Sequence, residues 1–90
     1  MIFSELKRLL IKEFKDSTID DEDSSLTIDC GLFFIRVSDW GDCYELEIET
    51  LSSDFGIQYF KILPRNINRA FAIIKSRTEF IKRFLLMESI

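Results

Sequence analysis

A segment in the middle of the chain alternates strictly between apolar and acidic side chains. Within residues 43–50, the apolar positions are Tyr44, Leu46 and Ile48, and the acidic positions between them are Glu45, Glu47 and Glu49. Because successive side chains of a β-strand point to opposite faces, this pattern predicts a strand with one buried and one solvent-exposed face. Sheets with one wet face are antiparallel, since parallel sheets are covered on both faces. The chain is therefore expected to fold around an antiparallel sheet.

Three further segments have strand-forming residues and are joined to this one by short connections. They are residues 26–30, 32–38 and 56–63. Gly31 suits a tight turn, residues 39–42 read Asp-Trp-Gly-Asp, and residues 52–54 separate the last two strands. Short connections between consecutive strands favour an antiparallel meander, here of four strands.

Amphipathic helices are expected before and after the strands. Residues 2–15 carry apolar side chains three and four positions apart, at Phe3, Leu6, Leu10 and Phe14. Pro64 ends the last strand, and Asn66 is a suitable N-cap for a long final helix. That helix has two apolar stripes, and together they are wider than one contact needs.

Residues 16–25 contain five carboxylates and no apolar period, so they are expected to form a solvated loop. The predicted fold class is α+β, in the order α-β-β-β-β-α. A four-stranded antiparallel sheet is flanked by the two helices, which both cover one face of it. The expected organisation is a single domain over residues 1–90, because the chain has only 90 residues.

Composition argues against most kinds of chemistry. The chain has no histidine, which excludes histidine bases and histidine metal ligands. Its two cysteines, Cys30 and Cys43, lack the spacing of zinc or redox motifs, and they are expected to be reduced thiols unless the strands that carry them pair. The glycines are isolated, and the acidic segment 16–25 does not match a calcium-binding loop. We therefore expect no catalytic residues, no metal and no cofactor.

Charge is distributed unevenly along the chain. The net charge is +2 over residues 1–15, −11 over residues 16–60 and +5 over residues 61–90, which gives −4 for the whole chain. A net acidic protein is not expected to bind nucleic acid or an anionic membrane directly. The chain also lacks an apolar run of membrane-spanning length and the charge order of a signal peptide, so a cytoplasmic location is expected.

The acidic strand has two interpretations. Glu45, Glu47 and Glu49 either form the solvated face of an antiparallel sheet or, with Asp42, a binding surface for a basic protein. Carboxylates two positions apart on a strand lie about 6.6–6.8 Å apart, which resembles the phosphate repeat of a nucleic-acid strand. The partner could then be a nucleic-acid-binding complex. Apolar anchors for it are expected from Trp40, Phe34 and Phe60, although the Trp40 ring could also fold back over the sheet rim.

In size and charge the chain resembles the small acidic inhibitor proteins of phages and mobile elements, among them anti-CRISPR proteins and toxin-immunity proteins. This resemblance implies a non-catalytic inhibitor that occludes a macromolecular machine by steric and electrostatic contact. The apolar face of the final helix is wider than one contact needs, and apolar surface left uncovered favours association with another protein or another copy. Two alternatives therefore remain: a homodimeric chaperone or adaptor for one cognate protein, and a purely structural subunit.

Overall fold

The sheet and helices expected from the sequence are present, with one strand more than predicted. The computed structural model describes residues 2–50, 56–62 and 66–88. Its elements are α1 (Ile2–Glu13), β1 (Thr18–Asp21), β2 (Ser25–Asp29), β3 (Phe33–Asp39), β4 (Tyr44–Thr50), β5 (Ile57–Ile62) and α2 (Ile67–Glu88). The strand order is β1-β2-β3-β4-β5, and every neighbouring pair is antiparallel. The expected α+β meander between two helices is confirmed, but the prediction of four strands is wrong.

The additional strand, β1, lies in the acidic segment that was expected to be a loop. It pairs with β2, and its Ile19 lies opposite Ile28 and packs against the core. The Glu22 N–H donates to the Ser25 carbonyl at 2.9 Å and closes the turn between the two strands. A strand of four residues with one apolar side chain has no measurable alternation, so the pattern could not reveal it.

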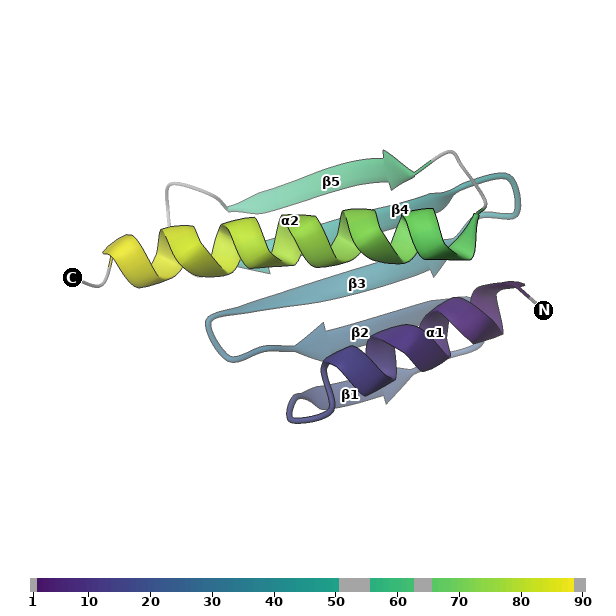
Figure 1. Ribbon diagram of the computed structural model, residues 1–90, viewed down its shortest axis with the longest axis horizontal. Coiled ribbons are helices and arrows are strands. Elements are labelled where there is room, and N and C mark those ends of the chain that lie inside the picture. The colour runs from purple at the N-terminus through teal and green to yellow at the C-terminus, as the bar shows by residue number, and fades with distance from the viewer. Residues whose placement is uncertain (1, 51–55, 63–65, 89–90) are drawn as a thin grey trace.

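Both helices cover the same face of the sheet. In Figure 1, α1 lies in front of β1 and β2, while α2 passes in front of β4 between β3 and β5. The fully buried side chains come from both layers: Leu6 and Leu10 from α1, Leu26, Ile28, Ile35, Val37, Tyr44, Leu46, Ile48 and Ile62 from the strands, and Ala70 and Ile74 from α2. The opposite face of the sheet has no described element over it.

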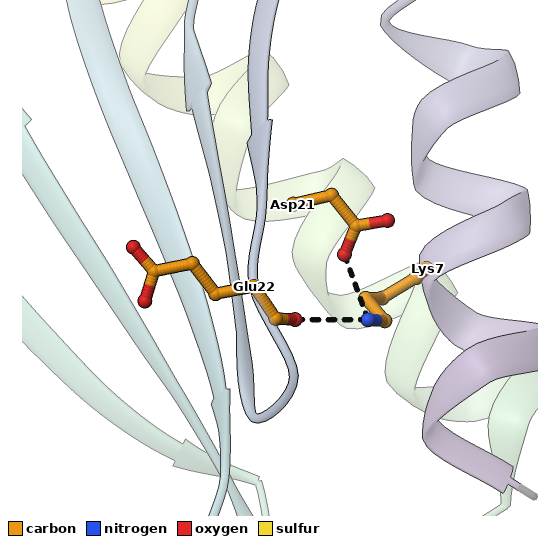
Figure 2. A network of polar contacts seen from close by, with 3 residues as sticks. All are labelled: Lys7, Asp21 and Glu22. Atoms are coloured by element: carbon orange, nitrogen blue, oxygen red, sulfur yellow. Dashed lines mark hydrogen bonds and ion pairs between the residues drawn. The ribbon is translucent and has the colours of Figure 1, made fainter.

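Lys7 fixes α1 to the turn between β1 and β2. Figure 2 shows its ammonium group donating to the Asp21 carboxylate at 2.7 Å and to the Glu22 carbonyl at 2.9 Å. The same ammonium group lies 5.3 Å from the centre of the Phe3 ring. The Lys7 side chain is only 15% exposed. Part of the acidic segment is therefore used structurally, to hold the first helix in place.

The final helix begins as expected and leaves apolar side chains uncovered. The Arg69 N–H donates to the Asn66 side-chain carbonyl at 3.1 Å, so Asn66 is the N-cap. The inner face of α2 buries Ala70, Ile74, Thr78 and Ile81, whereas its outer face exposes Phe80 and Met87. None of the helices in the described ranges combines the length and the hydropathy needed to cross a bilayer.

Candidate functional site

The most distinctive surface of the molecule is the uncovered face of its sheet, which we call the open face. The cross-strand register assigns to this face the side chains of Thr18, Asp20, Ser25, Thr27, Asp29, Phe34, Arg36, Ser38, Glu45, Glu47, Glu49, Ile57, Tyr59 and Lys61. In the view of Figure 1 it is the side of the sheet turned away from the helices. Its five carboxylates outnumber its two cations, Arg36 and Lys61, so it is net acidic.

The three glutamates of β4 form a row along the centre of the open face. Glu45 lies between Ser38 and Lys61 in the register, and Glu47 lies between Arg36 and Tyr59. Glu49 has the apolar neighbours Phe34 and Ile57. Each glutamate is therefore half-buried among its neighbours, and only Glu45 and Glu47 have a cation beside them.

The ionic contact within this row is weak. The Arg36 guanidinium lies 4.0 Å from the Glu47 carboxylate, and the Arg36 side chain is 52% exposed. Arg36 also donates to the Thr27 hydroxyl at 3.3 Å, which holds it along the sheet. The Glu47 side chain is only 19% exposed, but a contact as long as 4.0 Å with an exposed guanidinium contributes little to stability. Glu47 consequently remains able to interact with a cation supplied from outside.

Exposed apolar side chains border the acidic row. Ile57 and Tyr59 of β5 are 49% and 61% exposed, and Trp40 is 63% exposed. Trp40 belongs to the tight turn between β3 and β4, in which its N–H donates to the Cys43 carbonyl at 3.0 Å and Gly41 adopts a φ of 91°. The turn therefore displays the indole at the end of the sheet.

A hollow of about 380 Å³ connects the indole to the glutamates. Its lining includes Trp40, Arg36, Glu45, Glu47 and Ser38. Glu22 and Asp39 also line it, so an aromatic wall lies beside four carboxylates and one guanidinium. Such a lining is suited to a cationic or amphipathic side chain of another molecule.

The structure brings together most, but not all, of the residues expected to bind a partner. Glu45, Glu47, Glu49 and Phe34 share the open face, while Trp40 borders it and the exposed Asp42 lies in the same turn as Trp40. Phe60 lies on the other face, opposite Leu46, and packs against the core. It therefore cannot contribute to one surface with the glutamates.

Ile57, Tyr59, Arg36 and Lys61 also belong to the open face, although the sequence did not single them out. The signal that could have found Ile57 and Tyr59 is the alternation of β5, in which they occupy the face opposite Phe60 and Ile62. Both faces of that segment are apolar, so the pattern alone does not tell which face is covered.

The two cysteines are free and lie at opposite ends of β3. Cys30 contacts the start of β3 through its N–H, which donates to the Phe33 carbonyl, whereas Cys43 contacts Trp40 just beyond the end of β3. Because β3 lies between β2 and β4, the strand pairing that a disulfide requires does not occur.

Burial raises the pKa of both thiols. For Cys43, Asp42 raises the pKa further, because its carboxylate accepts the thiol's hydrogen bond and repels a thiolate. For Cys30, the Asp29 charge adds to the effect of burial, while a hydrogen bond with Ser17 and the Lys82 charge oppose it. Folding thus favours the neutral thiols, and this contribution to stability is lost as the pH rises above the ordinary thiol pKa.

We expect iodoacetamide to modify both cysteines slowly at neutral pH in the folded protein, and faster as the pH is raised, because only the thiolate reacts. Asp42→Asn should lower the pKa of Cys43 and speed its modification several-fold. Cys30 serves as the internal control, since Asp42 does not act on it. Peptide mass spectrometry separates the two rates. Equal acceleration at both cysteines would show general loosening of the fold instead.

Within the described part of the chain, no three or more Cys, Asp or Glu side chains are grouped so as to hold a metal ion. Comparisons with models of known protein families, with curated proteins and with solved structures found no match to this chain.

Proposed function

We propose that this chain is a non-catalytic binding protein whose open face engages a basic surface on another protein. The observation that carries the proposal is the composition of that uncovered face, which has five carboxylates, and on which the glutamate row of β4 lies beside the exposed Ile57 and Tyr59 and is bordered by Trp40. A sheet face that served only to contact water would not need three large apolar side chains exposed beside its charges.

The two kinds of side chain have different roles in association. The carboxylates attract a basic partner over a distance and raise the association rate. Tyr59 and Trp40 supply large, rigid contact surfaces of the type that dominates binding energy in protein interfaces. Because these groups are fixed on paired strands and a tight turn, little conformational freedom is lost on binding.

The finer proposal is inhibition by occlusion. A protein that covers the basic surface of a nucleic-acid-binding complex blocks its substrate without any chemistry. The glutamate row supports such a target, because alternate carboxylates on β4 repeat at about 6.6–6.8 Å, and nucleic-acid-binding surfaces are rich in Lys and Arg. The partner is thus expected to be a protein with a basic nucleic-acid channel.

The test is the combined variant Glu45→Lys, Glu47→Lys and Glu49→Lys. We expect it to reduce capture of the partner from a lysate of the source cells by at least about tenfold at low salt. Capture by the unchanged protein should itself fall as salt is raised, because the attraction is screened. Capture is quantified by mass spectrometry, and binding of the captured protein to nucleic acid is then measured with and without the chain.

A matched control carries the same change of charge outside the open face. Glu5, Asp16 and Asp23 are exposed and lie on α1 or in loops, so replacing all three by lysine alters the net charge equally. This control should retain capture. The proposal is wrong if both triple variants lose the partner alike, or if light scattering shows a homodimer that captures nothing at either salt concentration.

A further inference from the structure

The two edges of the sheet differ in length and in protection. The β1 edge has four residues, of which Asp20 and Asp21 are acidic, and the nearby Lys7 ties it to α1. The β5 edge has six residues, reads Ile-Gln-Tyr-Phe-Lys-Ile and contains a single charge, at Lys61. Figure 1 shows no described element beyond β5. Long apolar edge strands with few charges readily pair with another strand.

The backbone groups on the outer side of β5 can be assigned from its pairing with β4. The Thr50 N–H donates to the Gly56 carbonyl at 3.0 Å, which identifies residues 50 and 56 as a hydrogen-bonded pair. Because such pairs alternate along an antiparallel ladder, residues 58, 60 and 62 also bond to β4. Ile57, Tyr59 and Lys61 therefore direct their N–H and carbonyl groups away from the sheet.

A groove runs beside this edge, between β5 and α2. It has a volume of about 520 Å³, and its lining includes Phe60, Ile62, Ile73, Arg69 and Arg77. The Arg77 guanidinium carbon lies 4.6 Å from the centre of the Phe60 ring, so the ring supports the cation at the wall of the groove. Among the described residues, neither Arg69 nor Arg77 forms an ion pair. The groove is thus apolar at its base and cationic at its rim.

We propose that the β5 edge and this groove bind an extended acidic segment of a partner protein as an added strand. The segment's backbone pairs with the outward groups of Ile57, Tyr59 and Lys61. Its alternate side chains reach the groove, where carboxylates meet Arg69 and Arg77. The site shares β5 with the open face, but it recognises an acidic segment through the outward backbone of β5 and the two arginines, whereas the open face is expected to select a basic surface, so either proposal can fail without the other.

Charge decides between an acidic segment and a second copy of the chain. Two β5 strands paired about a twofold axis, with their helices on one side of the joined sheet, bring the Arg69 and Arg77 groups of both copies to the same junction. Like charges placed together oppose that arrangement. An acidic strand supplies the missing carboxylates instead.

The probe is a short fluorescein-labelled peptide in which valine and glutamate alternate, and binding is measured by fluorescence anisotropy. Valine favours the extended conformation, and the alternation places all carboxylates on one side. Two control peptides have the same length. One alternates valine and lysine, and the other is the valine–glutamate peptide with N-methyl groups at alternate residues on its pairing side. We expect both controls to bind at least about tenfold more weakly, because each lacks a required interaction.

Two pairs of protein variants test the same contacts by changing the protein instead of the peptide. Tyr59→Pro removes an outward N–H but no bond to β4, so an edge strand tolerates it, whereas Tyr59→Ala removes only the ring. Arg77→Glu reverses a charge in the groove, and Arg83→Glu makes the same change elsewhere on α2. Because Tyr59 itself lines the groove, Tyr59→Ala is the reference for loss of the ring, and Tyr59→Pro should bind at least about tenfold more weakly than this reference. Arg77→Glu should weaken binding at least about tenfold relative to the unchanged protein, while Arg83→Glu stays within about threefold.

Several results would overturn the proposal. These are no binding of the valine–glutamate peptide by the unchanged protein at millimolar concentration, equal binding of either control peptide, and equal effects of Arg77→Glu and Arg83→Glu. A concentration-dependent dimer that Tyr59→Pro abolishes would assign the edge to a second copy. If circular dichroism shows that Tyr59→Pro does not fold, the N-methylated peptide still tests the backbone pairing.

Discussion

Replacing Ile74 by aspartate is expected to abolish cooperative folding. Ile74 is fully buried on the inner face of α2, in line with Ala70, Thr78 and Ile81. Loss of a buried isoleucine side chain costs about 2–5 kcal/mol, and an unpaired buried carboxylate costs about 3–5 kcal/mol more. The free energy of unfolding of a domain is itself only about 5–15 kcal/mol. Circular dichroism and thermal melting should show little native structure and no cooperative transition.

The control introduces the same charge on the other side of the helix. Ser76 is exposed two positions further along α2. Ser76→Asp is expected to change the free energy of unfolding by no more than about 0.5 kcal/mol, as substitutions at exposed positions generally do. If Ile74→Asp melted like Ser76→Asp, α2 would not pack on the sheet through this face.

The second large effect is expected from Leu46→Ala. Leu46 is fully buried at the centre of β4, between Val37 and Phe60 in the register. Truncation to alanine leaves a cavity that the paired strands on either side cannot close. We therefore expect the free energy of unfolding to fall by about 2–5 kcal/mol, measured by urea denaturation with an unchanged slope.

Leu32→Ala provides the matched comparison for this change, because it deletes the same atoms from a side chain that is 52% exposed. Its effect should stay within about 0.5 kcal/mol. Similar losses at the two positions would contradict the assignment of Leu46 to the covered face and of the β4 glutamates to the open face.

The sequence predicts those parts of the fold in which a residue pattern spans a whole element. The alternation in residues 43–50 assigns Leu46 and Glu47 to opposite faces, and the register confirms this assignment. Gly31 and Gly41 lie in the turns where they were expected, with φ values of 92° and 91°. β1 was missed because tertiary contact, through Ile19 and the pairing with β2, stabilises it rather than its own pattern.

The candidate surface could be predicted only in part, because a pattern gives alternation but does not say which side is covered. The face that Glu45, Glu47 and Glu49 occupy could be predicted from the sequence, because charged side chains are rarely buried and so mark the solvent-facing side of a strand. Phe60 and Tyr59 are neighbours on a strand that is apolar on both sides, and only the position of α2 decides between them. The helix covers Phe60 and leaves Tyr59 on the open face.

The strand order has a consequence for biosynthesis. Because the order in the sheet equals the order in the chain, each strand that leaves the ribosome finds its neighbour already made. The cover of the sheet arrives in two stages, however, with α1 before any strand and α2 after all five. A nascent chain that has released β5 but not residues 67–88 therefore still exposes the apolar strand side chains that α2 covers in the complete fold. When α2 emerges and packs on the sheet, it buries these side chains, and chaperones can then no longer bind them.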